Sequence, residues 1–355
     1  MNPLFVVLLM AVGSACAASF YVPIRKVKMW SWETYWIIQG IASWIVAPLI
    51  FAILTVPQLS LIISDTPTSG LLGCIFWGAL WGVGGLTFGL SMRYLGVALG
   101  QSIALGFCGA FGTLIPPMIG GTLNTPEGII MLIGVALSIA GIAVVGYAGS
   151  LKSQTMSDED KKKAVKEFAL KKGLLIAVVA GIMSACMNYG IGGLPGITKE
   201  PGFFDAGNLI QIAAKAHGTN PLFITSPVFI FVMFGGFLTN FVYCFYLSLK
   251  NKSYKDFKTV TGNIILMNVL FSFLGGTLWF LQFFFFGMGK SMLPSGMMAF
   301  SWSILMALNI VFSNVWGIIL NEWKGSSKKT ILVLSIGLLV LLLSIFVIKI
   351  PIQTN

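Results

Sequence analysis

Charged side chains are scarce in this sequence. Only 9% of its 355 residues are Asp, Glu, Lys or Arg, whereas 57% are hydrophobic. Soluble domains usually carry about 25% charged residues, and a chain this apolar needs lipid to cover much of its surface. The shortage of charge therefore excludes an ordinary soluble protein and predicts an integral membrane protein.

The residues that most enzymes need are also missing. There is one histidine, His217, so an HExxH zinc site cannot form, and no Walker sequence for ATP occurs. The five cysteines lie singly within apolar runs and form no CxxC pair. We therefore expect no catalytic residue, no metal and no cofactor, and we exclude transport driven by ATP.

Long apolar stretches dominate what is present. A helix needs about 20 such residues to cross a hydrocarbon core of about 30 Å. Stretches of this length exclude a membrane β-barrel, whose strands are about 10 residues long and alternate. Ten spans are predicted, at 4–23, 34–56, 70–92, 97–120, 127–149, 173–193, 222–249, 262–289, 294–320 and 330–349.

Lys and Arg collect in alternate gaps between these spans. The gaps after the first, third, fifth, seventh and ninth spans hold 18 of the 22 basic residues. Cytoplasmic loops of membrane proteins carry such an excess, so we predict that these gaps are cytoplasmic and that both termini are external. The net charge of +11 is thereby explained by the lipid bilayer, and we predict no nucleic-acid partner.

A charged linker at 151–172 divides the spans into five and five. We expect the linker to be cytoplasmic, between a first half at 1–150 and a second half at 173–355. Because each half has an odd number of spans, the second half must enter the membrane in the opposite direction. The predicted fold is an all-α membrane protein with ten transmembrane helices in two inverted five-helix repeats, an architecture common in transporters.

The two halves also repeat in sequence. Gly78–Gly89 aligns without gaps with Gly276–Gly287, which places Trp81 opposite Trp279. Both segments lie in the third span of their half. Agreement in span order supports a duplication.

Uncharged polar side chains recur at helical spacing within the spans. An unpaired amide costs several kcal/mol in lipid, so these side chains should face protein or water. They could bind a solute, or they could hydrogen-bond between helices. We predict a substrate-binding site formed by eight of them: Gln282, Asn268, Trp279, Ser272, Asn188, Gln101, Asn309 and Trp302.

The charged residues near the spans fall at predicted span ends. We interpret Arg93, Glu33, Glu127, Lys290 and Glu322 as interfacial anchors whose heads reach water. A site without buried charge suits a neutral solute. Amides can bond to sugar hydroxyls and indole faces can cover the apolar face of a sugar ring, so we predict a small neutral sugar as the substrate.

Five segments resemble a known family. They read FYVPIRKVKMWSWETYW at 20–36, MRYLG at 92–96, LKKGL at 170–174, LQFFFFGMGK at 281–290 and NEW at 321–323. In order and spacing they resemble the L-rhamnose–proton symporter family of the drug/metabolite transporter superfamily. The resemblance implies ten helices in two repeats, and uptake of L-rhamnose or a related deoxysugar with protons across a bacterial cytoplasmic (inner) membrane.

The group that would bind the proton is less clearly marked. The resemblance implies an acidic residue and a tyrosine after the proline that opens the ninth span, and the stretch from Pro294 to Phe300 contains neither. The remaining proton-coupling candidates are Glu33, in the matching first-loop motif, and His217, in the gap at 194–221. The default interpretation of a histidine in that gap is a solvated loop residue, and a proton site is the alternative.

Two other functions fit the same pattern. The chain could be a metabolite or drug exporter of the same superfamily, or a membrane sugar sensor that binds without transporting. A long soluble signalling domain would favour the sensor, and none is present in these 355 residues. The sequence pattern does not indicate the oligomeric state.

The distribution of basic residues predicts the topology. A reporter inserted in 151–172 should be cytoplasmic and a C-terminal reporter external, because the cytoplasmic loops retain Lys and Arg. A pair of fusion reporters, each active on only one side of the membrane, measures this. An external position for the 151–172 reporter would overturn the orientation.

Overall fold

The computed structural model describes residues 3–347, except 96, 155–168, 195–196 and 198–201. Within them, ten helices are long and apolar enough to cross a membrane, and they confirm the ten predicted spans. Most of the predicted linker at 151–172 lies outside the described residues. The helices α1, α6, α7, α8 and α10 cover Pro3–Ser19, Thr68–Leu95, Val97–Ile119, Pro126–Gln154 and Leu170–Gly192.

The second half supplies four further long helices. They are α12 (Ser226–Asn251), α14 (Gly262–Ser291), α15 (Ser301–Ile319) and α16 (Lys328–Phe346). The remaining span is the second in chain order, and it consists of three consecutive helical segments. These are α3 (Trp32–Ile41), the π-helical turn η1 (Ala42–Val46) and α4 (Ala47–Thr55).

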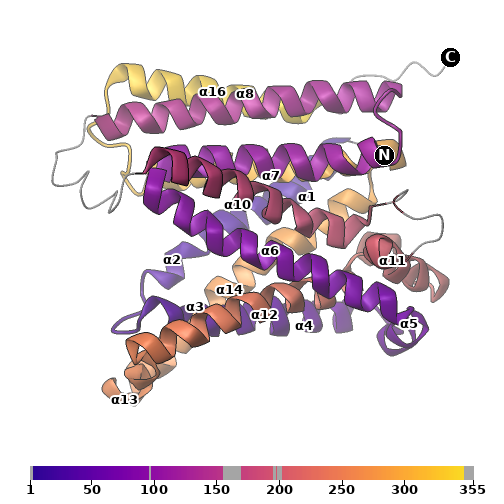
Figure 1. Ribbon diagram of the computed structural model, residues 1–355, viewed down its shortest axis with the longest axis horizontal. Coiled ribbons are helices and arrows are strands. Elements are labelled where there is room, and N and C mark those ends of the chain that lie inside the picture. Colours follow the sequence, from indigo (N-terminus) through magenta and orange to yellow (C-terminus); the bar gives the residue numbers. More distant parts are fainter. Residues whose placement is uncertain (1–2, 96, 155–168, 195–196, 198–201, 348–355) are drawn as a thin grey trace.

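Short helices cap the ends of the bundle. Five of them lie between spans: η4 (Ser253–Lys255), α13 (Asp256–Thr259), α5 (Leu59–Asp65), η2 (Phe203–Asp205) and α11 (Ala206–Ala216). The other three belong to spans: α2 (Tyr21–Ile24) ends the first, η3 (Pro221–Phe223) begins the seventh and η5 (Ser295–Phe300) begins the ninth. In Figure 1, α5 and α11 lie at the end where α1 begins and α16 ends, while α2 and α13 lie at the opposite end. The gap after the sixth span therefore holds a helix, α11, packed on α6, α10 and α5.

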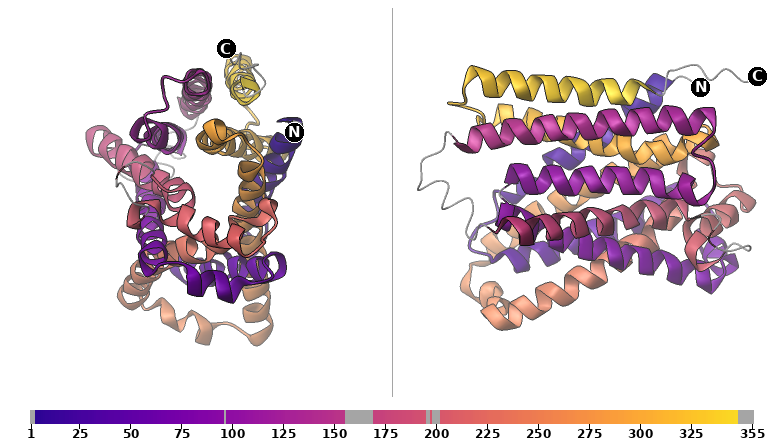
Figure 2. Two further views of the ribbon diagram at one scale, coloured as in Figure 1. Left: turned by 90° about the vertical axis from the view of Figure 1, so that its right-hand side faces the viewer. Right: turned by 45° about the horizontal axis from the view of Figure 1, so that its top comes forward.

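The long helices pack in a regular order. The helix α10 packs on α6 and α7, and α1 packs on α14 and α15. The helices α8 and α16 pair with each other at one edge of the bundle, and α3 and α12 lie at the opposite edge (Figures 1 and 2). The centre of the protein therefore lies among the helices between these edges: α1, α6, α7, α10, α14 and α15.

Glycine permits the closest of these helix contacts. A Cβ on Gly78 of α6 would overlap the carbonyl oxygen of Val232 on α12, and a Cβ on Gly235 of α12 would overlap the carbonyl oxygen of Ile75. Gly85, also on α6, has no such neighbour within 4 Å. Small residues let backbones approach in this way, so α6 and α12 meet backbone to backbone near Gly78.

This contact predicts a position-dependent cost of one methyl group. Gly78→Ala should destabilise the protein by about 1–3 kcal/mol, because two backbones must move apart to admit the added atom. Gly85→Ala on the same helix is the matched control and should be neutral or slightly stabilising. Thermal unfolding of the purified protein in one detergent measures both. Equal melting temperatures for the two variants would contradict the contact.

Candidate functional site

Three indoles meet at the centre of the protein. Trp81 of α6 and Trp279 of α14 are stacked, with ring centroids 5.6 Å apart and an interplanar angle of 28°. Trp44 of η1 meets both rings edge-on, at 6.2 and 5.9 Å. Phe283, one turn beyond Trp279, contacts both Trp279 and Trp81. We call Trp44, Trp81 and Trp279 the indole cluster.

A change of helix type places Trp44 in this cluster. Residues 42–46 form a π-helical turn within the second span, a local widening that often marks functional sites. Trp44 also covers Gly40, where a Cβ would lie 2.6 Å from the indole ring. The Trp44 Nε1 is buried and has no hydrogen-bond partner among the described residues. An orphaned donor of this kind is available to a ligand.

Two amides connect α14 to α15 beside the indole cluster. Gln282 donates from Nε2 to the carbonyl oxygen of Trp279 at 3.0 Å, and its Oε1 accepts from Asn309 Nδ2 at 3.1 Å. The Asn309 Oδ1 is buried and has no partner in the part of the chain that is described. The structure therefore brings Gln282, Asn309 and Trp279 together, with one acceptor left unused.

The other two predicted residues of α14 have different surroundings. Asn268 is buried, and its side chain both accepts from the backbone N–H of Lys28 at 3.0 Å and donates to the Lys28 carbonyl at 2.8 Å. This amide fixes the loop that follows the first span, so its polar atoms are already engaged. Ser272 is fully buried, and its hydroxyl has no partner among the described residues.

Asn188 and Trp302 form a second group beside Phe286, one turn beyond Gln282 on α14. Asn188 donates from Nδ2 to the carbonyl oxygen of Gly112 on α7 at 2.7 Å. Trp302 donates to the Cys108 carbonyl at 3.2 Å, and its ring contacts Phe286 edge-on. Both side chains are buried. Gln101 is half-buried on α7, and the structure brings it into neither group.

The side-chain oxygen of Asn188 accepts a hydrogen bond from Lys290, a residue that the sequence places at a span end. Lys290 Nζ donates to Asn188 Oδ1 at 3.2 Å, and the Lys290 side chain is only 6% exposed. The interpretation of Lys290 as an interfacial anchor was wrong. It failed because Gly192 on α10 leaves room for the amine to fold inward: a Cβ there would lie 2.7 Å from Nζ.

Glu33 is not an interfacial anchor either. It is 4% exposed and accepts from Ser253 Oγ at 2.7 Å and from Asn251 Nδ2 at 3.0 Å. Asp256, beside it, accepts from the Ser31 N–H at 2.7 Å. This Glu33 cluster joins the loop after the first span to the loop after the seventh. Sequence distance hid it, because the partners lie more than 200 residues away.

The second proton candidate, His217, joins a different pair of loops. Its Nε2 lies 2.7 Å from Asp65 Oδ2, and its Nδ1 lies 3.0 Å from Gln58 Oε1. His217 follows α11, so these contacts connect the gap after the sixth span to the gap after the second. We call these residues the His217 cluster. His217 is a half-buried loop residue with two polar partners, and its role in proton coupling stays a prediction.

The remaining charged residues at span ends lie near the surface. Glu322 pairs with Arg25 at 3.2 Å, and both side chains are well exposed. Glu127 lies against Gly296 of η5. Neither carboxylate reaches the amides or the indole cluster.

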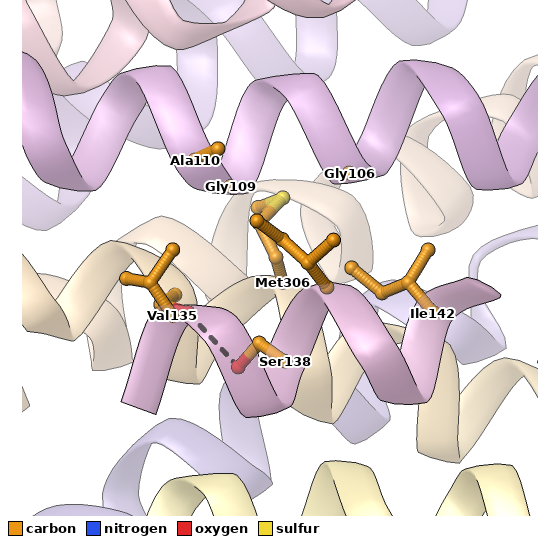
Figure 3. A pocket seen from close by; sticks show the side chains of 9 residues that line it. Gly106, Gly109, Ala110, Val135, Ser138, Ile142 and Met306 are labelled. Atoms are coloured by element: carbon orange, nitrogen blue, oxygen red, sulfur yellow. Dashed lines mark hydrogen bonds between the residues drawn. The ribbon is translucent and has the colours of Figure 1, made fainter. Parts of the chain in front are cut away.

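A shallow recess lies elsewhere, between α7, α8 and α15, and it has essentially no enclosed space for even a water molecule. Figure 3 shows Val135, Ile142 and Met306 around it, with Ser138 as a polar group. Ser303 donates to Ser138 at 3.1 Å, and Ser138 donates to Ser344 at 2.8 Å. Ligand sites for small molecules are usually about 300–1,000 Å³, so we assign no substrate to this small apolar recess.

Comparison with known proteins agrees with this architecture. A sequence model of the L-rhamnose-proton symport protein family matches residues 2–353. The L-rhamnose-proton symporter of Yersinia pestis is 38% identical over 339 residues, covering 94% of this chain and 93% of the relative. That of Yersinia pseudotuberculosis matches to the same extent.

The chain belongs to the L-rhamnose–proton symporter family. The match confirms the resemblance carried by the first-loop and eighth-span motifs. The members of this family are transporters, not enzymes. The sequence did not predict Trp44 and Trp81, whose rings the structure places against that of the predicted residue Trp279. The signal for Trp81 was its alignment with Trp279. The signal for Trp44 was absent, because a π-helical turn has no sequence rule.

The two amides of α14 give a direct test of the site. Gln282→Ala should weaken sugar binding by about 5- to 150-fold, since a ligand hydrogen bond left unmade costs about 1–3 kcal/mol. Asn268→Ala, on the same helix, should instead lower the melting temperature with little effect on affinity, because its bonds hold the Lys28 loop. Calorimetric binding and thermal unfolding separate the two. If Gln282→Ala changes stability alone, the site assignment fails.

Proposed function

We propose that this protein takes up L-rhamnose, or a closely related deoxysugar, together with protons. The observation that carries the proposal is the family match over residues 2–353, in which the curated relatives are named L-rhamnose-proton symporters. The chemistry of the centre supports it. An uncharged amide pair beside aromatic rings suits a neutral sugar, whose hydroxyls need acceptors and whose ring needs an apolar face.

The sugar site of this proposal lies at the indole cluster and the Gln282–Asn309 pair. The unused Asn309 Oδ1 can accept from a sugar hydroxyl, and the Trp44 Nε1 can donate to one. Trp81 and Trp279 now cover each other's faces. Separation of α6 from α14 would expose those faces to the sugar ring.

We also propose that the two halves are inverted repeats. Equivalent helices make equivalent contacts: α1 packs on α14 and α15 as α10 packs on α6 and α7. At a finer scale, Gly13 of the first span packs against Gln282 in the eighth, and Gly84 of the third packs against Ser184 in the sixth. The stacked indoles are themselves aligned positions.

Alternating access between such repeats needs contacts that break at one end of the bundle at a time. The Glu33 cluster and the His217 cluster are suited to this. The first joins the loops after the first and seventh spans, and the second joins the loops after the sixth and second, which are equivalent pairs in the proposed repeat. Both candidates for proton coupling thus occupy gate positions.

For location, we propose a bacterial cytoplasmic membrane with both termini external. The 18 basic residues in alternate gaps support this orientation. It places the Glu33 cluster at the cytoplasmic end and the His217 cluster at the external end. Lipid and the transported solutes are the proposed partners, without nucleic acid.

Counterflow in proteoliposomes tests the substrate. Unlabelled L-rhamnose inside should drive entry of labelled L-rhamnose, and L-mannose, which carries a hydroxyl on C6, should compete about 5- to 150-fold less well. The reason is that an extra hydroxyl against an indole without a partner costs about 1–3 kcal/mol.

Three results would contradict the proposal. Binding without counterflow would indicate a sensor, and efflux of unrelated metabolites without rhamnose counterflow would indicate an exporter. Equal competition by L-mannose would remove the deoxysugar preference.

A further inference from the structure

Lys290 is an amine buried between α10 and α14. Its Nζ donates to Asn188 Oδ1 at 3.2 Å, and lies 5.9 Å from the centroid of the Phe286 ring. Gly192 closes the other side. An ionisable side chain inside a membrane protein marks a functional site by default, and neither amide nor aromatic ring supplies a negative charge.

The surroundings of this amine hold no carboxylate partner. Among the described residues, no carboxylate oxygen lies within 4.0 Å of Lys290 Nζ. Asp205 of η2 lies against Gly193, the residue after Gly192, and burial raises the pKa of its carboxyl. On α10, Cys186 and Tyr189 lie within one turn of Asn188, and Lys171 and Lys172 lie at the opposite end of the helix. Cys108 is the titratable group of α7, and Asp205 is that of η2.

Hydrogen-bond accounting distinguishes the two states of the amine. An ammonium has three N–H donors, and among the described residues only one of them has an acceptor. A buried ion costs several kcal/mol when it is not fully paired, whereas a neutral amine leaves no charge to compensate. Burial of Lys290 as the structure shows it therefore suits the neutral amine. Burial of the ammonium requires additional hydrogen-bond acceptors.

The position of Lys290 connects it to the helices that would move. Asn188 bonds the Gly112 carbonyl of α7 in addition to Lys290. Trp302 of α15 packs against Gly112 and against Phe286 of α14. The fourth, sixth, eighth and ninth spans therefore converge at this amine. Protonation of Lys290 would therefore change contacts to helices of both halves.

We propose that Lys290 is the residue that carries the transported proton, and that sugar hydroxyl oxygens supply the acceptors that its ammonium lacks. This rests on the proposed rhamnose–proton symport. On the external side the amine lone pair takes H⁺ from hydronium and releases water. On the cytoplasmic side the ammonium returns H⁺ to water, and the amine is restored.

This chemistry accounts for coupling. Each ligand can shift the access equilibrium only by its differential affinity for the two states. The empty protein can close on the neutral amine, and the fully loaded protein can close because the sugar satisfies the ammonium. The ammonium without sugar cannot be buried cheaply, which prevents a proton leak. Sugar without the proton loses charge-assisted hydrogen bonds and binds weakly.

The test uses the full-length protein in proteoliposomes with labelled L-rhamnose. At one proton per sugar, wild type should accumulate rhamnose about tenfold per pH unit of gradient, acid outside. Lys290→Met should give no accumulation and yet retain rhamnose exchange at equal pH. Lys215→Met, an exposed lysine on α11, is the matched control and should accumulate like wild type. Asp205→Asn tests the carboxylate that lies against Gly193 and should also retain accumulation.

Direct proton measurement covers the variants whose transport is impaired. In detergent at weak buffering, rhamnose should drive proton uptake by wild type, and its affinity should fall about tenfold per pH unit once the amine is neutral. Lys290→Arg keeps the charge and should bind rhamnose about as tightly as protonated wild type, whereas Lys290→Met should bind it about as weakly as wild type with a neutral amine. Neither variant should take up protons, and neither affinity should depend on pH.

Several outcomes overturn the assignment. Retained accumulation in Lys290→Met does so, most clearly if Glu33→Gln or His217→Gln loses it. Loss of rhamnose binding in both Lys290 variants also counts against it, because the sugar would keep its contacts to Gln282 and Asn309. Absence of rhamnose exchange in wild type refutes the proposed function instead, so the two failures are distinguishable.

Discussion

The cost of removing a polar group from water governs this structure. In lipid, a backbone amide, a side-chain amide or an amine must find its partner within the protein. The helices satisfy the backbone, and the side chains satisfy one another between spans. Asn268 does so with the Lys28 backbone, and Glu33 does so with Ser253 and Asn251. Ten buried side-chain atoms among the described residues have no hydrogen-bond partner. Two of them, Asn309 Oδ1 and Trp44 Nε1, belong to residues at or beside the indole cluster and are therefore candidate positions for a ligand.

The same rule explains why the spans were predictable and the partners were not. A run of about 20 apolar residues has one stable solution in a bilayer, so ten helices follow from composition and length. The polar stripe on α14 correctly placed Gln282 near Trp279. It could not distinguish Asn268, because the Lys28 loop that engages it lies 240 residues away in the chain. Spacing along one helix reports a shared face, not the neighbour of that face.

Lys290 illustrates the limit at span ends. A lysine one residue before a helix ends ordinarily extends to the interface. Here Gly192 and Asn188 on α10 provide a space and an acceptor, and the side chain is buried instead. The Lys290 amine is buried and not at the interface because a small residue, Gly192, lies beside it on a helix about 100 positions away in the chain. Conversely, Trp81 was recoverable, because the aligned segments of the two halves already paired it with Trp279.

The stacked indoles have a consequence for recognition. Trp81 and Trp279 occupy aligned positions, but the positions three residues later are Gly84 and Gln282. A pair of like rings is nearly twofold symmetric, whereas a sugar is chiral and has no such symmetry. Two equivalent faces alone would let the ring bind in either of two poses. In the proposed sugar site the amide of Gln282 is present on one side only, because Gly84 stands at the aligned position. That difference between the halves is what would distinguish the two poses and select one hand of sugar.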